Sequence, residues 1–416
     1  MIKRKLLKSL GDHLSAKELS LIIGPRQSGK TTIMMLLKEE LDRKGESTLF
    51  MNLDIEKDSH FFSSQSLLVK KIELELGKKR GFVFIDEIQR KENAGLFLKG
   101  IYDMNLPYKF IVSGSGSLEL KEKIHESLLG RKRLFELSTV SFMEFLDYVT
   151  NYKYRDRMDE LFAIEKDRVR EYLNEYLNYG GYPRVILAEK QREKFLIIDE
   201  IYKSYIEKDI SYLLKVEKIK AFESLVIFLA SQTGQLVNFS ELSNSIGTSV
   251  ATVSNYIKYG EGTFVFKRLS PFFKNVRNEI TKSPKIYFGD VGFRNYSLGK
   301  FGTLFDPEDF GAVFENFIYI LLKEKISNSP YKLHFWRTKD KAEVDFILDL
   351  SGEIIPIEVK FKSSGKISRS FRNFLTKYNP NKALIVTTNF HSEVKVGKTA
   401  VKFVPFWDLY KMDVFN

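Results

Sequence analysis

Eight consecutive residues near the N-terminus have the types and spacing that bind phosphate. The run GPRQSGKT at residues 24–31 matches the pattern G-x-x-x-x-G-K-[ST]. Its glycines let successive backbone N–H groups turn toward phosphate oxygens, its lysine supplies charge for the β- and γ-phosphates, and its last threonine offers a hydroxyl to Mg²⁺. The run predicts binding of ATP and Mg²⁺ with these contacts to the nucleotide: Gly24, Pro25, Arg26, Gln27, Ser28, Gly29, Lys30, Thr31 and Thr32.

A second group of polar residues follows apolar runs further along the chain. Asp86 and Glu87 come directly after 81–85, and Ser113 follows 109–112. Because parallel strands end at one edge of a sheet, we expect all three residues beside the phosphate loop. Asp86 would hold Mg²⁺, Glu87 would orient or deprotonate the attacking water, and Ser113 would contact the γ-phosphate or that water. A simple turn would also explain Ser113.

Two carboxylates and a lysine in the last quarter of the chain form a further candidate site. Glu358 and Lys360 lie two residues apart, so in a strand they share one face of the sheet. Asp345 lies 13 residues before Glu358, a separation that suits a hairpin with the two side by side. Mg²⁺ prefers oxygen ligands, so Asp345 and Glu358 are expected to bind it, with Glu315 from a preceding helix as a further ligand. Lys360 would stabilise developing charge or position the attacking water.

The elements that must position these residues follow from the hydrophobic pattern. The glycine-rich run stands between a strand pattern and a helical pattern, which is the context that a phosphate loop requires. In the first third we predict helices at 3–18 and 32–41 and strands at 19–23, 47–53, 81–85 and 109–112. In the last third we predict helices at 310–325 and 370–378 and strands at 333–337, 342–348, 354–361, 382–387 and 401–404.

The middle of the chain begins with a charged, aromatic and helical region at 155–215. A Gly-Gly-Tyr-Pro turn at 180–183 interrupts it. Arg184, which follows the turn, either reports on the nucleotide or forms a salt bridge. Arg131, earlier in the chain, is either an arginine finger that acts in cis or across a subunit boundary, or an ordinary surface residue. A finger in trans would require a homo-oligomer.

Residues 220–298 predict a winged helix-turn-helix. Helices at 222–231, 239–246 and 249–259 flank a turn at Gly247, Ser240 is placed to cap the second helix, and strands at 264–269 and 285–288 follow. Such folds bind DNA in some proteins and pack against protein in others. On DNA, Thr252, Asn255 and Lys258 would face the major groove, and Arg277, Lys282 and Lys285 would contact phosphate.

In their order along the chain, these motifs resemble the AAA+-related ATPases of bacteria and archaea. The similarity lies in GPRQSGKTT, FVFIDEIQ, VSGSGS and LLGRKRLFEL followed by VSFMEFL. The motif E…D…ExK resembles the PD-(D/E)xK nuclease superfamily, although Val344 precedes Asp345 and the literal PD dipeptide is absent. The resemblance implies an α/β fold with a P-loop NTPase core at 1–150, a helical lid at 151–218, a winged helix at 219–300 and a small restriction-endonuclease-like domain at 301–416.

Composition limits the partners and the compartment. The 66 Lys and Arg residues exceed the 54 Asp and Glu residues, and the net charge of +12 favours an anionic partner. Zero cysteines exclude disulfides and thiol chemistry, and charges interrupt every apolar run before the ~18 residues of a membrane span. We therefore expect a cytoplasmic protein without membrane contact. A basic cluster beside the ExK motif would fit DNA phosphates or form a solvated face: Lys360, Lys362, Lys366, Arg369 and Arg372.

Two functions are compatible with these motifs. In the first, ATP binding and hydrolysis are coupled to DNA binding and to DNA cleavage at the C-terminal site. In the second, the protein is an ATP-gated switch or interaction protein whose nuclease-like domain binds without cutting. The dependence of DNA binding on salt would separate them, because phosphate contacts release counterions.

Overall fold

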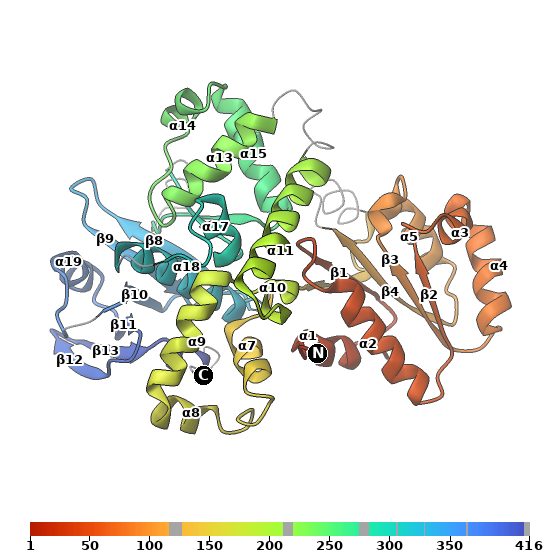
Figure 1. Ribbon diagram of the computed structural model, residues 1–416, viewed down its shortest axis with the longest axis horizontal. Helices are drawn as coiled ribbons and strands as arrows, with labels where there is room; N and C mark the ends of the chain where they lie inside the picture. Colours follow the sequence, from red (N-terminus) through yellow and green to blue (C-terminus); the bar gives the residue numbers. More distant parts are fainter. Residues whose placement is uncertain are drawn as a thin grey trace.

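The computed structural model describes residues 1–115, 127–210, 219–273, 283–304, 307–327, 329–362 and 365–411. Figure 1 shows a first sheet with its helices at the right, a group of helices at the top and centre, and a second sheet at the left. The N-terminus lies near the centre, between the first sheet and the rest of the chain. Within the described residues, no helix is long and apolar enough to cross a membrane.

The first sheet is parallel and has five strands in the order β2-β3-β4-β1-β5. Its apolar side chains fill two cores, one under α1 and α2 and the other under α4 and α5. This confirms the predicted α/β class, while α1 is shorter than the predicted helix 3–18. The elements are α1 (Leu6–Asp12), β1 (Leu19–Gly24), α2 (Lys30–Arg43), β2 (Thr48–Asn52), α3 (Glu56–Ser59), α4 (Gln65–Leu76), β3 (Gly81–Asp86), α5 (Ala94–Asp103), β4 (Tyr108–Ser115) and β5 (Lys132–Glu136).

Helices fill the middle of the chain and divide between two cores. The first three, α7 (Phe142–Val149), α8 (Met158–Ile164) and α9 (Lys166–Tyr179), share a core with the C-terminal domain. The next helices surround a separate core. They are α10 (Pro183–Leu187), α11 (Gln191–Ser204), a π-helical turn (Tyr205–Ile210), α13 (Ile219–Ser231), α14 (Phe239–Ser245), α15 (Val250–Gly262) and α17 (Val291–Ser297).

Helices α14 and α15 stand where the helix-turn-helix was predicted, with one difference at the cap. The side chain of Asn238, rather than that of Ser240, accepts hydrogen bonds from the backbone N–H groups of Ser240 and Glu241. Helix α14 therefore begins two residues earlier than a Ser240 cap would allow, since the cap residue precedes the first turn. Gly247 has φ of +65°, which suits glycine in the turn between the helices.

The hairpin β6 (Phe266–Leu269) and β7 (Lys285–Phe288) packs between two cores. Ile286 and Phe288 belong to the core of the middle helices, whereas Tyr287 belongs to the core of the C-terminal domain. Lys285 is fully buried, so the prediction that it contacts DNA phosphate is wrong. A strand with two buried faces buries every side chain, and the sequence alone suggested an exposed wing. Arg277 and Lys282 lie outside the described residues.

The C-terminal domain has a mixed six-stranded sheet in the order β12-β13-β11-β10-β9-β8. β8, β9 and β10 run antiparallel, whereas β10, β11 and β13 run parallel. Helix α18 covers one face and α19 the other. The elements are α18 (Pro307–Lys325), β8 (Lys332–Arg337), β9 (Glu343–Asp349), β10 (Ile354–Lys360), α19 (Arg369–Tyr378), β11 (Lys382–Thr387), β12 (Ser392–Val396), β13 (Thr399–Pro405) and α20 (Asp408–Lys411).

Phe317 in α18 gives a direct test of the shared core. It is 2% exposed, and its ring lies 5.7 Å from that of Phe142 and 5.5 Å from that of Phe406. We expect Phe317→Ala to lower the free energy of unfolding by about 3–5 kcal/mol, because a large buried side chain leaves a cavity. Phe195→Ala, at a position that is 49% exposed, should cost about 1 kcal/mol or less. Equal losses in denaturant unfolding would contradict the shared core.

Candidate functional site

The phosphate loop connects β1 to α2, and its shape depends on glycine at two positions. Gly29 has φ of +95°, a conformation that side chains disfavour. At Gly24 a Cβ atom would lie 2.1 Å from the backbone oxygen of Leu137, so no side chain fits there. Lys30 is buried, and its Nζ donates to the carbonyl oxygens of Gly24 (3.1 Å) and Pro25 (2.8 Å). Its ammonium thus lies within the curl of the loop.

Asp86 is the polar centre of this sheet edge. It is fully buried at the end of β3, and its Oδ2 accepts a hydrogen bond of 2.7 Å from Thr31 Oγ1. Its Oδ1 accepts hydrogen bonds from the Ser113 hydroxyl and from the backbone N–H of Glu87. The structure therefore brings together predicted residues from α2, β3 and β4. Carboxylate and hydroxyl oxygens suit Mg²⁺, so this donor set fits the expected ion.

Glu87 follows Asp86 in a left-handed conformation, with φ of +57°. Burial raises the pKa of its carboxyl group, the charge of Asp86 raises it further, and Lys30 opposes the shift. The side chain of Gln89 donates a hydrogen bond to Glu87, which also lowers the pKa. A carboxylate with a raised pKa beside a phosphate loop is a suitable base for a water molecule.

A pocket of about 510 Å³ opens beside the phosphate loop. The predicted residues Arg26, Gln27, Ser28, Gly29, Lys30, Thr31, Thr32 and Glu87 line it. Its other walls come from the N-terminal residues Met1, Ile2 and Arg4 and from Pro183, Arg184, Leu187 and Glu200. Arg184 Nη1 donates to Gln27 Oε1 (3.0 Å) and to the carboxylate of Glu200. Arg184 forms the predicted salt bridge, with Glu200, and also contacts the phosphate loop through Gln27. That it reports on the nucleotide stays a prediction.

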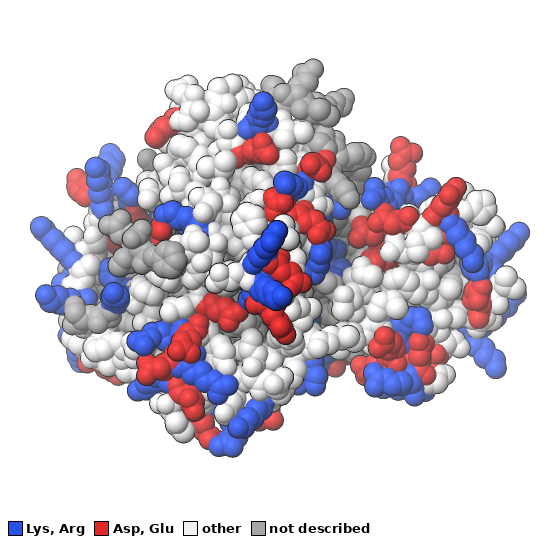
Figure 2. All heavy atoms as spheres, in the orientation of Figure 1, with Lys and Arg blue, Asp and Glu red and all other residues white. Residues whose placement is uncertain are grey.

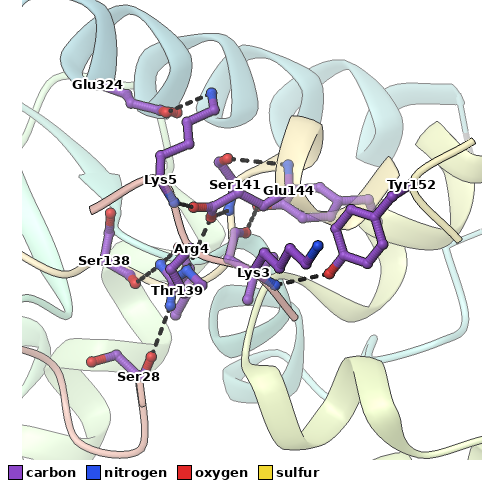
Figure 3. Close-up of polar contacts among 12 residues, drawn as sticks. Lys3, Arg4, Lys5, Ser28, Ser138, Thr139, Ser141, Glu144, Tyr152 and Glu324 are labelled. Atoms are coloured by element: carbon purple, nitrogen blue, oxygen red, sulfur yellow. Dashed lines mark hydrogen bonds and ion pairs between the residues drawn. The ribbon is translucent and has the colours of Figure 1, made fainter. Parts of the chain in front are cut away.

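The sequence reasoning missed Arg4, which joins several elements at the pocket (Figure 3). Its guanidinium donates to the backbone oxygens of Ser28 (2.9 Å), Ser138 (2.7 Å) and Thr139 (3.2 Å) and to Glu144 (3.1 Å). Residues 3–18 predicted only an amphipathic helix, in which Arg4 is one of several similar cations. Three of its acceptors are backbone carbonyls, which have no signature in the sequence.

Arg131 lies at the opposite edge of the first sheet. Its backbone oxygen accepts from the N–H of Leu19, at the start of β1, and its side chain pairs with Asp103 at 2.8 Å. The phosphate loop begins at the other end of β1, about 16 Å away at the rise of a β-strand. An arginine finger in cis is therefore wrong for this arrangement. Action in trans stays a prediction.

The C-terminal candidate residues make contacts with each other and with nearby backbone. Glu358 Oε1 lies 2.7 Å from Lys360 Nζ, and its Oε2 accepts from Ser368 at 2.9 Å. Asp345 Oδ2 accepts from the backbone N–H of Val359 at 2.8 Å. Burial, together with the charge of Glu315, raises the pKa of Asp345 to about 8.

Glu315 makes close contacts to β7. Its Oε1 accepts a hydrogen bond of 2.6 Å from the Tyr287 hydroxyl and lies 3.8 Å from Lys285 Nζ. Gly234 covers the same oxygen so closely that a Cβ atom would lie 2.7 Å from it. Over the described residues, no three acidic or histidine side chains form a group that could hold a metal ion. The predicted metal-ligand role of Glu315, with Asp345 and Glu358, does not fit this arrangement.

Three families match successive parts of the chain. Residues 16–146 match the family described as AAA domain, and residues 170–303 and 310–409 match two domains of unknown function, DUF8612 and DUF4143. An uncharacterized protein of Haemophilus influenzae is 26% identical over 98% of this chain and 98% of its own length. An uncharacterized protein of Mycobacterium tuberculosis is 28% identical over 89% of this chain and 76% of its own.

Solved structures of low similarity were also found. The Orc1 protein of Aeropyrum pernix in complex with DNA is 13% identical over 71% of this chain and 91% of that chain, with a TM-score of 0.30. AMPPCP-bound DnaA from Aquifex aeolicus is 17% identical over 62% of this chain and 86% of that chain, with a TM-score of 0.26. TM-scores this low carry no argument. The AAA domain match and the parallel five-stranded sheet support a nucleotide-binding P-loop core.

The raised pKa of Glu87 predicts a pH dependence. Because a base must be deprotonated, turnover of ATP should fall as the pH drops through a midpoint above the ~4.3 of an ordinary glutamate. Gln89→Ala should move this midpoint to higher pH, since the hydrogen bond that lowers the pKa is lost. The measurement is the pH profile of kcat. A profile that is flat across this range, or a midpoint that Gln89→Ala leaves in place, would contradict the role of Glu87.

Proposed function

We propose that this protein is an Mg²⁺-dependent ATPase that couples its nucleotide state to DNA binding. The observation that carries the proposal is the meeting of Lys30, Thr31, Asp86 and Ser113 at one edge of a parallel sheet, with Glu87 beside them. Hydrolysis of a phosphoanhydride needs phosphate-binding, metal-binding and basic groups. Here Lys30, Thr31 and Glu87 line one pocket, and the buried Asp86 bonds to Thr31.

In the proposed hydrolysis, the loop N–H groups and Lys30 bind the β- and γ-phosphates. Thr31 and Asp86 would hold Mg²⁺, which neutralises charge on the phosphate oxygens when it is bound. Glu87 orients the attacking water and accepts its proton. The water oxygen bonds to the γ-phosphorus, the bond to the β–γ bridging oxygen breaks, and ADP and inorganic phosphate result.

The walls of the pocket suggest how the nucleotide state reaches the rest of the chain. Arg184 joins Gln27 of the loop to Glu200 of α11, and Arg4 joins Ser28 to Glu144 of α7. A ligand shifts a conformational equilibrium only by the difference in its affinity for the two states. ATP bound in this pocket would touch both walls, so its affinity would depend on how the helices lie against the core.

The DNA surface that we propose is the exposed face of α15. Asn255 and Lys258 are exposed there, and Thr252 is half-buried beside the α14–α15 turn. Across the face in Figure 2, Lys and Arg mix with Asp and Glu, and basic side chains gather at the left end, over the C-terminal domain. The net charge of +12 would strengthen binding of a polyanion without choosing its sequence.

The proposal does not include DNA cleavage, because the C-terminal carboxylates do not gather as a metal site. This observation favours one part of the alternative function, in which the C-terminal domain binds without cutting. An ATP-gated protein that binds another protein in place of DNA would share the same pocket. DNA binding that is absent at low salt would favour that alternative.

Two variants separate nucleotide binding from hydrolysis. Lys30→Ala should abolish measurable ATP binding, because it removes the cation of the phosphate loop. Glu87→Gln should keep ATP binding and lose turnover by about 100-fold or more, since the base is gone and the shape is kept. Binding by calorimetry and turnover by phosphate release measure the two effects. Full turnover in either variant would contradict the proposed site.

The DNA surface predicts a salt effect for one lysine. If Lys258 contacts a phosphate, Lys258→Ala should reduce the slope of log affinity against log salt by about one. Lys44→Ala is the matched control, because Lys44 is an exposed lysine at the end of α2, on the first domain. Fluorescence anisotropy with labelled duplex DNA measures both. If the slope of log affinity against log salt is equal for the two variants, Lys258 does not contact DNA and the proposed surface on α15 is wrong.

A further inference from the structure

Lys285 is a buried cation at the junction of the β6–β7 hairpin and the C-terminal domain. Its side chain is fully buried. Its Nζ lies 2.5 Å from Glu343 Oε1 and 3.8 Å from Glu315 Oε1, and 5.4 Å from the centre of the Phe335 ring. We propose that this ammonium group is the resident cation of the C-terminal acidic cluster, so that the docked domain holds no divalent metal ion.

The backbone around Lys285 fixes where its side chain begins. Lys285 pairs with Leu269 of β6 and forms an isolated bridge with Leu236. The hairpin in turn joins the second sheet, because the N–H of Phe272 donates to Phe335 at 2.6 Å and the N–H of Phe335 donates to Ser270 at 3.2 Å. The ammonium therefore reaches the cluster as part of one continuous backbone network.

The acidic cluster consists of Glu315, Glu343 and Asp345, and two cations lie beside its Glu343. Glu343 pairs with Lys285 through Oε1 and with Arg337 through Oε2 at 2.6 Å. The three carboxylates are half-buried, and these cations offset part of their negative charge. A divalent ion that entered would meet the positive charge of Lys285.

One oxygen of Glu315, one of Asp345 and both of Glu358 already have partners. Glu315 Oε1 accepts from Tyr287, and Asp345 Oδ2 accepts from the backbone of Val359. Glu358 uses one oxygen for Lys360 and the other for Ser368. Mg²⁺ demands near-octahedral oxygen coordination, so it would have to break several of these contacts.

Binding of Mn²⁺ alone, measured by electron paramagnetic resonance without nucleotide, tests this inference. Asp345→Asn is the matched control, since any Mn²⁺ that it retains binds at another place. We expect wild type and Asp345→Asn to bind equal amounts of Mn²⁺ and to show equal melting temperatures with and without the ion. Wild-type binding of one Mn²⁺ per chain that Asp345→Asn abolishes would overturn the inference.

Lys285→Met supplies the complementary measurement, because methionine keeps an unbranched side chain and removes the charge. We expect a lower melting temperature and a new Mn²⁺ site that Asp345→Asn abolishes in the same background. A folded Lys285→Met protein with wild-type stability, or one that takes up no Mn²⁺, would contradict the inference. If Lys285→Met does not fold, Mn²⁺ binding by wild type compared with Asp345→Asn still tests whether the C-terminal site holds a metal ion.

Discussion

The hydrogen bonds of Arg4 are the interaction on which the nucleotide pocket depends. The side chain is 9% exposed, and its guanidinium must be satisfied by fixed acceptors because it has lost most of its water. Those acceptors belong to the phosphate loop, to the segment after β5 and to α7. The N-terminal segment is held as a wall of the pocket for this reason. Lys5 extends the link, since its N–H donates to Glu144 and its Nζ lies 3.5 Å from Glu324 of α18.

A second buried cation has a comparable place at another junction. Lys285 stands between the hairpin and the C-terminal domain, as Arg4 stands between the first domain and α7. Buried ion pairs contribute little net stability, but they specify one arrangement because any other leaves a charge unpaired. Apolar packing, such as the Phe142, Phe317 and Phe406 rings, holds the same junctions together. Charge therefore selects how the parts meet, and the apolar cores stabilise that arrangement.

The features that could be predicted from the sequence are those whose residues lie close together along the chain. The phosphate loop, the Asp86–Glu87 strand end and the C-terminal hairpin strands were all found from patterns within about a dozen residues. Contacts between distant segments were missed for a physical reason. The sequence around Lys285 is the same whether its strand is an exposed wing or is buried on both faces. Only a contact with a distant residue, Glu343, distinguishes the two arrangements. For Arg131 the sequence left a finger and a surface residue equally open, and the pairing of β5 with β1 places it at the far edge of the sheet.

Coupling between the phosphate loop and α15 is the central claim, and one thermodynamic cycle tests it directly. The dissociation constant of a non-hydrolysable ATP analogue is measured with and without saturating duplex DNA, and that of DNA with and without the analogue. Coupled sites must change each other by the same factor, and we expect about five-fold or more. If both ligands bind tightly but neither dissociation constant changes when the other ligand is present, the account is contradicted, because the two sites are then not coupled.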